Sequence, residues 1–183
     1  MKKTFIILAE GFEEIEAFTV VDVLRRLNII CDICSVNNAE VSGSHGIKVA
    51  ADNVFDKMDF DDYDVLILPG GMPGAKNLKS DQRVIKLINK FYKEHKLISA
   101  ICAAPIVLQE AGIIKDRRVT SYPNFRDELK DSIYLEDVVV QDDNIITSRG
   151  PATALEFAFK IAENIQGYEN VNITKNSMLV SLC

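Results

Sequence analysis

Short, uninterrupted hydrophobic runs alternate along the chain with stretches in which apolar residues recur every three or four positions. The uninterrupted runs predict buried parallel strands at residues 4–9, 29–36, 64–68 and 97–101. The three- and four-residue spacing predicts helices at residues 14–27, 81–95, 103–111 and 152–165. Two further segments have hairpin character, one at 41–51 and one formed by 137–141 and 145–147.

This alternation of strands and helices predicts a three-layer α/β fold around a mostly parallel sheet. No linker, repeat or low-complexity segment interrupts the 183 residues, so we expect a single domain over 1–183. Ligands of such folds bind beyond the carboxyl ends of the strands. Three features of the sequence fall at those ends: residues 10–16, Gly70-Gly71 and Cys102.

Composition and charge exclude several classes of function. Lys and Arg number 21 and Asp and Glu 27, which gives a net charge of −6, and there is no Trp. A nucleic-acid binder with a basic surface or an aromatic stacking platform is therefore not expected. The apolar run after Lys2-Lys3 is too short for a signal peptide, and no run approaches the ~20 residues that span a bilayer. We expect a cytoplasmic protein that binds neither nucleic acid nor membrane.

The cysteines include one pair with C-x-x-C spacing, Cys31 and Cys34, inside the predicted strand 29–36. Strand residues three apart face opposite sides of a sheet, and a redox pair needs a helix N-terminus, so we interpret them as ordinary strand cysteines. With only two histidines in the chain, zinc is disfavoured and no metal is predicted. Glycine-rich nucleotide motifs are missing, so no cofactor is expected either.

Cys102 lies where strand 97–101 meets helix 103–111, between Ala100-Ile101 and Ala103-Ala104. Small residues at such a junction are typical of a sharp turn that projects a nucleophile. The positive end of the following helix favours the thiolate, so the sequence predicts a lowered pKa for Cys102. The alternative is an inert buried cysteine, the usual fate of this residue type.

Two neighbouring segments could complete a site around Cys102. The backbone N–H groups of Gly70-Gly71, with that of Ala103, could form an oxyanion hole. One of the glutamates at the start of the first helix could face the thiol as a proton donor or acceptor, but the pattern does not choose among Glu13, Glu14 and Glu16. No histidine is adjacent to Cys102 in sequence, so a cysteine–histidine dyad is not visible.

Four segments in order along the chain resemble the ThiJ/PfpI superfamily, in the branch of the Parkinson's-disease protein deglycase and its bacterial relatives. They are AEGFEEIE at 9–16, LPGG at 68–71, AICAAP at 100–105 and TSRGP at 147–151. The resemblance implies a flavodoxin-like sandwich of the class I glutamine amidotransferase-like type. It also implies a homodimer built partly on the first helix, with Asp22 and Arg26 near the interface.

The resemblance further assigns roles to individual residues. Cys102 matches an easily oxidised nucleophile, and Glu16 matches a protonated glutamate that hydrogen-bonds its sulfur. Gly70, Gly71 and Ala103 match the substrate-binding oxyanion pocket.

This chain departs from the family pattern at several positions. Tyr122 stands where the branch often has a histidine, and His45 stands where a basic residue reaches over from the partner subunit. Ala103 stands where the proteolytic branch has a histidine directly after the cysteine, and this difference argues against a protease.

The resemblance implies a cysteine-dependent, cofactor-free glyoxalase III-type enzyme or protein deglycase. Its substrate would be methylglyoxal, a related 2-oxoaldehyde or a glycated protein, and its product a 2-hydroxy acid. A second hypothesis is an oxidative-stress sensor or chaperone that acts through oxidation of Cys102. A hydrolase or amidase of the wider superfamily is a third and weaker alternative.

Overall fold

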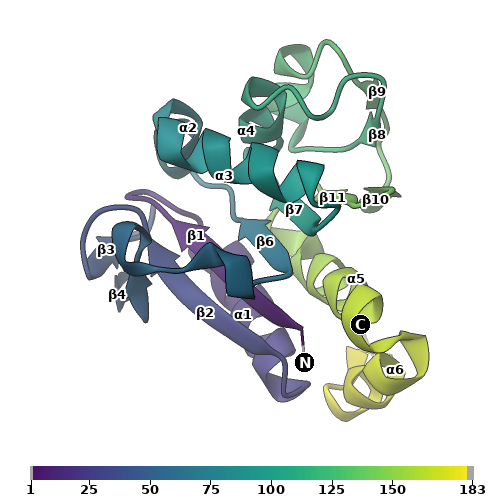
Figure 1. The fold of residues 1–183 in the computed structure, drawn as a ribbon. Helices are drawn as coiled ribbons and strands as arrows, with labels where there is room; N and C mark the ends of the chain where they lie inside the picture. The colour runs from purple at the N-terminus through teal and green to yellow at the C-terminus, as the bar shows by residue number, and fades with distance from the viewer. Residues whose placement is uncertain (1, 181–183) are drawn as a thin grey trace.

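The fold is built on a seven-stranded sheet, and the computed structural model describes residues 2–180 (Figure 1). Every neighbouring pair of strands in this sheet is parallel except β10 and β11, which form an antiparallel hairpin. In spatial order the strands are β10 (Val139–Asp142), β11 (Ile145–Ser148), β7 (Leu97–Ile101), β6 (Val65–Leu68), β1 (Lys3–Leu8), β2 (Ile30–Ser35) and β5 (Asn53–Val54).

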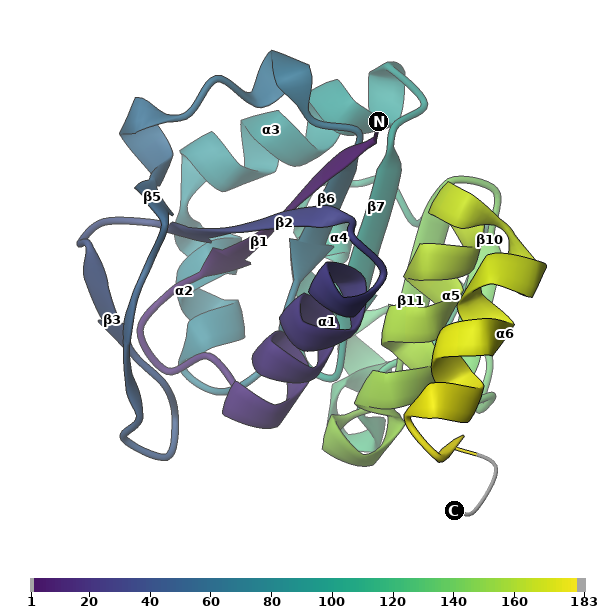
Figure 2. The same ribbon diagram turned by 90° about the horizontal axis from the view of Figure 1, so that it is seen from below.

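Helices cover both faces of this sheet, which confirms the predicted three-layer, flavodoxin-like α/β fold (Figures 1 and 2). One layer consists of α1 (Glu14–Arg26), α5 (Ala154–Gln166) and α6 (Tyr168–Ser177). The other consists of α2 (Gly74–Ser80), α3 (Gln82–Lys93) and α4 (Pro105–Glu110). The helix α1 packs against α5, and α6 packs on the outside of α5.

Several smaller elements lie outside the seven-stranded sheet. The segment predicted to be hairpin-like at 41–51 contains the antiparallel pair β3 (Glu40–Ser42) and β4 (Lys48–Ala50). A second pair, β8 (Arg118–Val119) and β9 (Ile133–Tyr134), is parallel. The 3-10 turns are η1 (Phe55–Lys57), η2 (Phe60–Asp62), η3 (Pro123–Glu128) and η4 (Pro151–Thr153).

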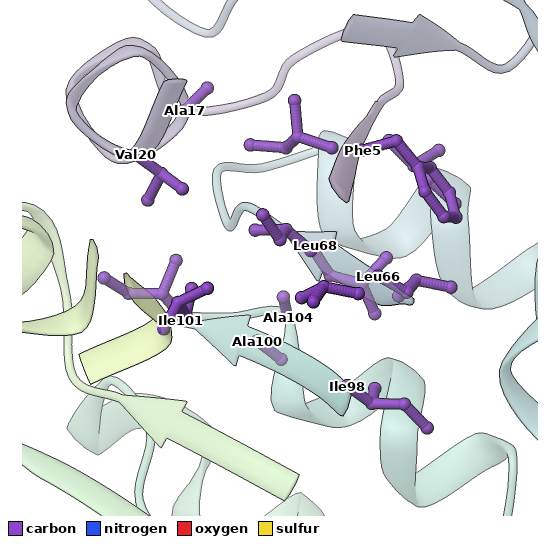
Figure 3. Close-up of a cluster of buried hydrophobic side chains, with 14 of the residues drawn as sticks. Phe5, Ala17, Val20, Leu66, Leu68, Ile98, Ala100, Ile101 and Ala104 are labelled. Carbon is purple, nitrogen blue, oxygen red and sulfur yellow. The ribbon is translucent and has the colours of Figure 1, made fainter. Parts of the chain in front are cut away.

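The centre of the sheet is buried on both faces, and for that reason its strands are continuous hydrophobic runs in the sequence. Leu66 and Leu68 of β6 lie beside Ile98 and Ala100 of β7 (Figure 3). All four side chains are fully buried. This core holds the carboxyl ends of β6 and β7 side by side, and the loops that leave them must therefore share one edge of the sheet.

The sequence prediction missed two helices. The helix α2 begins directly after the turn at 69–74 and buries only Gly74, Ala75 and Leu78. The helix α6 buries only Val171 among its residues. Neither helix has a wide apolar stripe, so neither leaves a helical hydrophobic periodicity in the sequence. Among residues 2–180, no helix combines the length and the hydrophobicity needed to cross a membrane.

Candidate active site

The backbone turns sharply at Cys102, between the end of β7 and the first turn of α4. Cys102 has a φ of 63°, in the left-handed region that residues with a Cβ rarely occupy. Its N–H donates to the carbonyl of Ser148 on β11 over 3.0 Å, and its own carbonyl accepts from the N–H of Tyr122 over 2.9 Å. These two bonds hold the strained conformation, and residues held in this way concentrate at functional sites. The predicted strand-to-helix turn is present.

Gly70 lets the backbone after β6 approach Cys102 closely. A Cβ on Gly70 would lie 2.7 Å from the Cys102 Cβ, 2.7 Å from Glu16 Oε2 and 2.9 Å from the Ala103 nitrogen. Each of these separations is too short for non-bonded atoms, so no larger residue fits without displacing the site. The close packing also shows that Cys102, Glu16 and Ala103 meet at Gly70.

Glu16 is the glutamate that faces Cys102, which settles the alternative that the sequence left open. Its side chain is completely buried, and its Oε2 accepts the Gly70 N–H over 2.8 Å. The Glu16 N–H donates to Glu13 Oε2 over 2.7 Å, so that Glu13 caps α1. The Glu13 N–H in turn donates to the Gly70 carbonyl over 3.0 Å. This ring of three hydrogen bonds fixes the Glu16 carboxyl against the turn at Gly70.

The Glu16 carboxyl and the Cys102 thiol are electrostatically coupled. Burial is the main reason that the pKa of Glu16 rises from 4.5 to about 7, and the charge of Glu13 adds to the rise. Burial, followed by the charge of Glu16, raises the pKa of Cys102. The predicted lowering of that pKa is therefore wrong, because desolvation and a like charge outweigh the short helix α4.

A proton on Glu16 changes this balance. Its Oε2 already accepts from Gly70, and its Oε1 is buried without a hydrogen-bond partner among the described residues, so the proton belongs on Oε1. Neutral Glu16 no longer repels a thiolate and can donate a hydrogen bond to it. As the pH rises through about 7 the pair gains one negative charge, and that charge can lie on the sulfur only while the proton stays on Glu16.

Backbone donors lie beside the sulfur. Hydrogen bonds from the N–H groups of Gly71 and Ala103 act to lower the pKa of Cys102, against the effect of burial. Gly71 has a φ of 88°, and a Cβ there would lie 2.3 Å from the Glu13 nitrogen. Only glycine can present its N–H to Cys102 in this position. The geometry is that of a pair of donors for an anion on or next to the sulfur.

Tyr122 and His45 lie differently with respect to this centre. The backbone N–H of Tyr122 holds this residue next to Cys102. The Tyr122 ring is exposed and packs near Gly150, where an added Cβ would lie 3.3 Å from the ring. His45 lies in the loop between β3 and β4 and hydrogen-bonds Glu14 of its own chain, with Nδ1 2.8 Å from Oε2. Within the chain, His45 thus contacts the start of α1 instead of the sulfur.

The remaining predicted features are outside the site. Cys31 and Cys34 are free and buried on β2, and burial raises their pKa values to about 11 and about 12. Asp22 and Arg26 form an exposed i,i+4 ion pair on α1 at 2.6 Å. Sequence reasoning missed the carbonyl of Ser148 that supports Cys102, although the TSRGP segment at 147–151 was already singled out by resemblance.

The raised pKa of Glu16 predicts a pH-dependent effect of Glu16→Gln on stability. Between pH 4.5 and 7 the folded state keeps a proton on Glu16 that the unfolded state has released, so wild-type stability falls as pH rises through this window. Glutamine does not titrate. We therefore expect the stability of Glu16→Gln relative to wild type to increase by up to about 3 kcal/mol between pH 5 and pH 8. Urea unfolding at both pH values measures this, and an equal difference at both would contradict it.

Known proteins resemble this chain in sequence and in fold. The sequence profile of the DJ-1/PfpI family matches residues 2–164. Protein dj-1beta of Drosophila melanogaster is 39% identical over 183 residues, covering 98% of each chain. The crystal structure of Drosophila melanogaster DJ-1beta superposes with a TM-score of 0.94 at 38% identity, again over 98% of each chain. A relative from Caenorhabditis elegans named glutathione-independent glyoxalase DJR-1.2 is 36% identical, covering 100% of this chain and 96% of its own. The chain belongs to the DJ-1/PfpI family.

Proposed function

We propose that this protein is a cysteine-dependent, cofactor-free glyoxalase that converts methylglyoxal and related 2-oxoaldehydes into 2-hydroxy acids. The observation that carries the proposal is the convergence of Glu16 and the N–H groups of Gly71 and Ala103 on Cys102, in a strained turn. The name of the Caenorhabditis elegans relative supports the reaction class.

The proposed reaction starts at the aldehyde carbon. The Cys102 thiolate attacks it, and Glu16 gives its proton to the former aldehyde oxygen, which yields a hemithioacetal and leaves Glu16 as a carboxylate. The N–H groups of Gly71 and Ala103 are the donors available to the negative oxygen while it forms. Among residues 2–180, Glu16 is the carboxyl that hydrogen-bonds the Cys102 thiol, so it is assigned the proton transfers that follow.

The redox change is internal to the substrate. Glu16 removes the proton from the former aldehyde carbon, an enediol forms, and Glu16 returns a proton to the neighbouring carbon. The first carbon is thereby oxidised to a thioester and the second reduced to an alcohol. Water then cleaves the thioester, releasing the 2-hydroxy acid and the free thiol of Cys102. Overall, one 2-oxoaldehyde and one water become one 2-hydroxy acid, and no external electron acceptor takes part.

The same thiol chemistry on early glycation adducts would make the protein a deglycase, which belongs to this proposal. Tyr122 is assigned a substrate contact at the rim of the site, because its ring is exposed and its backbone is bonded to Cys102. We also propose a cytoplasmic homodimer with contacts around α1. His45 is assigned no part in the reaction, because within the chain it hydrogen-bonds Glu14.

Lactate formation from methylglyoxal, without glutathione, tests the proposal. We expect turnover by the wild type and none above background for Cys102→Ser, because serine is not ionised at neutral pH. The matched control is Cys34→Ser, which alters a buried thiol on β2 away from the site and should retain activity. A folded, fully reduced wild type that forms no lactate would overturn the glyoxalase function.

Glu16→Gln separates proton transfer from placement of the thiol. Glutamine resembles the neutral acid in shape and can still accept the Gly70 N–H, so we expect alkylation of Cys102 by iodoacetamide at pH 7 to stay within about threefold of wild type. It cannot exchange protons with the substrate, so lactate formation should fall by about 10²-fold or more. Retained turnover would show that another group moves the proton.

Oxidative sensing through Cys102 is a second candidate function, and the exposure of the cysteines favours it. Cys102 retains 9% of its accessible surface, against 2% for Cys31 and none for Cys34. With dilute peroxide we expect a gain of two oxygens at Cys102, since its backbone donors and neutral Glu16 can bind a sulfinate. Peptide mass spectrometry measures this, with Cys31 and Cys34 as internal controls. Equal oxidation of all three would argue against a sensing role.

A further inference from the structure

A cavity of about 500 Å³ lies between α2, α4 and η3. Its volume is in the range of small-molecule binding sites, and its lining is mostly apolar. The helices α2 and α4 belong to the layer opposite α1, so the cavity is separate from the contact proposed between copies of the chain (Figures 1 and 2). The methyl group of methylglyoxal is far too small to fill this space, and the reaction described above leaves the cavity unused.

The three segments that line the cavity are the same three that meet at Cys102. Met72 directly follows the glycine whose N–H group bonds the sulfur. Ile106 lies about one helical turn after Cys102. Phe125 donates its N–H to the Tyr122 carbonyl over 3.0 Å, and the Tyr122 N–H donates to the Cys102 carbonyl over 2.9 Å. The cavity therefore begins beside the reactive sulfur.

The lining becomes more polar along each segment, with distance along the chain from the Cys102 site. The first lining residue of each segment is apolar. The later lining residues are Lys76, Lys79, Ser80 and Gln82 after Met72, Glu110 after Ile106, and Glu128 after Phe125. Lys79 and Glu128 form an ion pair at 3.2 Å, which links α2 to η3 at this polar end. The end of the cavity near Cys102 thus suits an apolar group, and the far end suits water or polar atoms.

The apolar end is incompletely covered by the protein itself. The Met72 side chain is 46% exposed and Phe125 is half-buried, whereas Ile106 is buried beneath them. Covering exposed apolar surface with an apolar ligand group is favourable. The Met72 thioether and the Phe125 ring are both good partners for an aromatic ring.

We propose that this cavity is a substrate subsite, which binds an apolar substituent of aromatic size on the 2-oxoaldehyde that Cys102 attacks. The inference rests on the proposed glyoxalase function and specifies its substrate class. Phenylglyoxal is a substrate of this kind, and with one water it would give mandelate by the steps already described. Apolar groups in such pockets change kcat/KM by about tenfold or more, so the subsite selects for substituents larger than methyl.

The ratio of kcat/KM for phenylglyoxal to kcat/KM for methylglyoxal tests the subsite, with mandelate and lactate measured as products. Differences in the intrinsic reactivity of the two aldehydes cancel when variants are compared with wild type. We expect Met72→Gln to lower the ratio at least about fivefold, because glutamine has a similar length but a polar end. Met72→Leu keeps an apolar side chain and should preserve the preference.

Ile173→Gln is the matched control, because it replaces another exposed apolar residue, on α6 away from the cavity. It should leave both reactions as in wild type. Equal ratios in Met72→Gln and Met72→Leu, or an equal fall in Ile173→Gln, would overturn the subsite.

A binding measurement separates failure of the subsite from failure of the glyoxalase function. Protein labelled with ¹³C at the methionine methyl groups is titrated with mandelate, and the Met72 signal is identified by its absence in Met72→Leu. We expect this signal to shift while those of Met58 and Met178, which do not line the cavity, stay in place. A Met72 signal that does not respond would overturn the subsite, whether or not methylglyoxal is turned over. A responsive signal without lactate formation would support the cavity as a binding site and overturn the glyoxalase function alone.

Discussion

A carboxyl and a thiol buried against each other cannot both be ionised at low cost, and this constraint organises the centre of the protein. Water does not reach Glu16, whose side chain has no exposed surface, so protein groups must provide the hydrogen bonds. The Gly70 N–H donates to the Glu16 carboxyl, and the Glu13 carboxylate accepts the Glu16 N–H. The N–H groups of Gly71 and Ala103 serve the Cys102 sulfur. Residues whose side chains would occupy the space at Gly70 or Gly71 are excluded, because the donors must come within hydrogen-bonding distance. The electrostatic requirement thereby determines the identity of the glycines.

The fold serves this requirement by bringing three loops to one edge. The loops after β1, β6 and β7 leave adjacent parallel strands in the same direction, so Glu16, Gly70 and Cys102 meet although 54 residues separate Glu16 from Gly70. The central strands are mostly apolar, and their hydrophobic packing together with the backbone ladder fixes the register. The residues at the strand ends thus form the reactive site, and the residues inside the strands stabilise the fold.

The strands and the long helices were predictable because hydrophobic burial leaves a periodic trace in the sequence. The location of the site followed from the same reasoning, since parallel strands end at a common edge. The choice of Glu16 over Glu13 and Glu14 was not predictable from periodicity, because it depends on how the first turn of α1 is rotated. The raised pKa of Cys102 was also missed, because desolvation depends on packing from other segments. The helices α2 and α6 escaped detection since each buries few side chains.

The two hydrogen bonds that hold the Cys102 backbone connect it to distant parts of the chain. One partner, Ser148, follows it by 46 residues, and the other, Tyr122, by 20. During synthesis the chain must therefore be extended beyond β11 before the left-handed turn at Cys102 is supported. A nascent or partly unfolded chain would present this thiol as an ordinary one, without its donors and without Glu16. The special reactivity of the cysteine is thus confined to molecules that have completed folding.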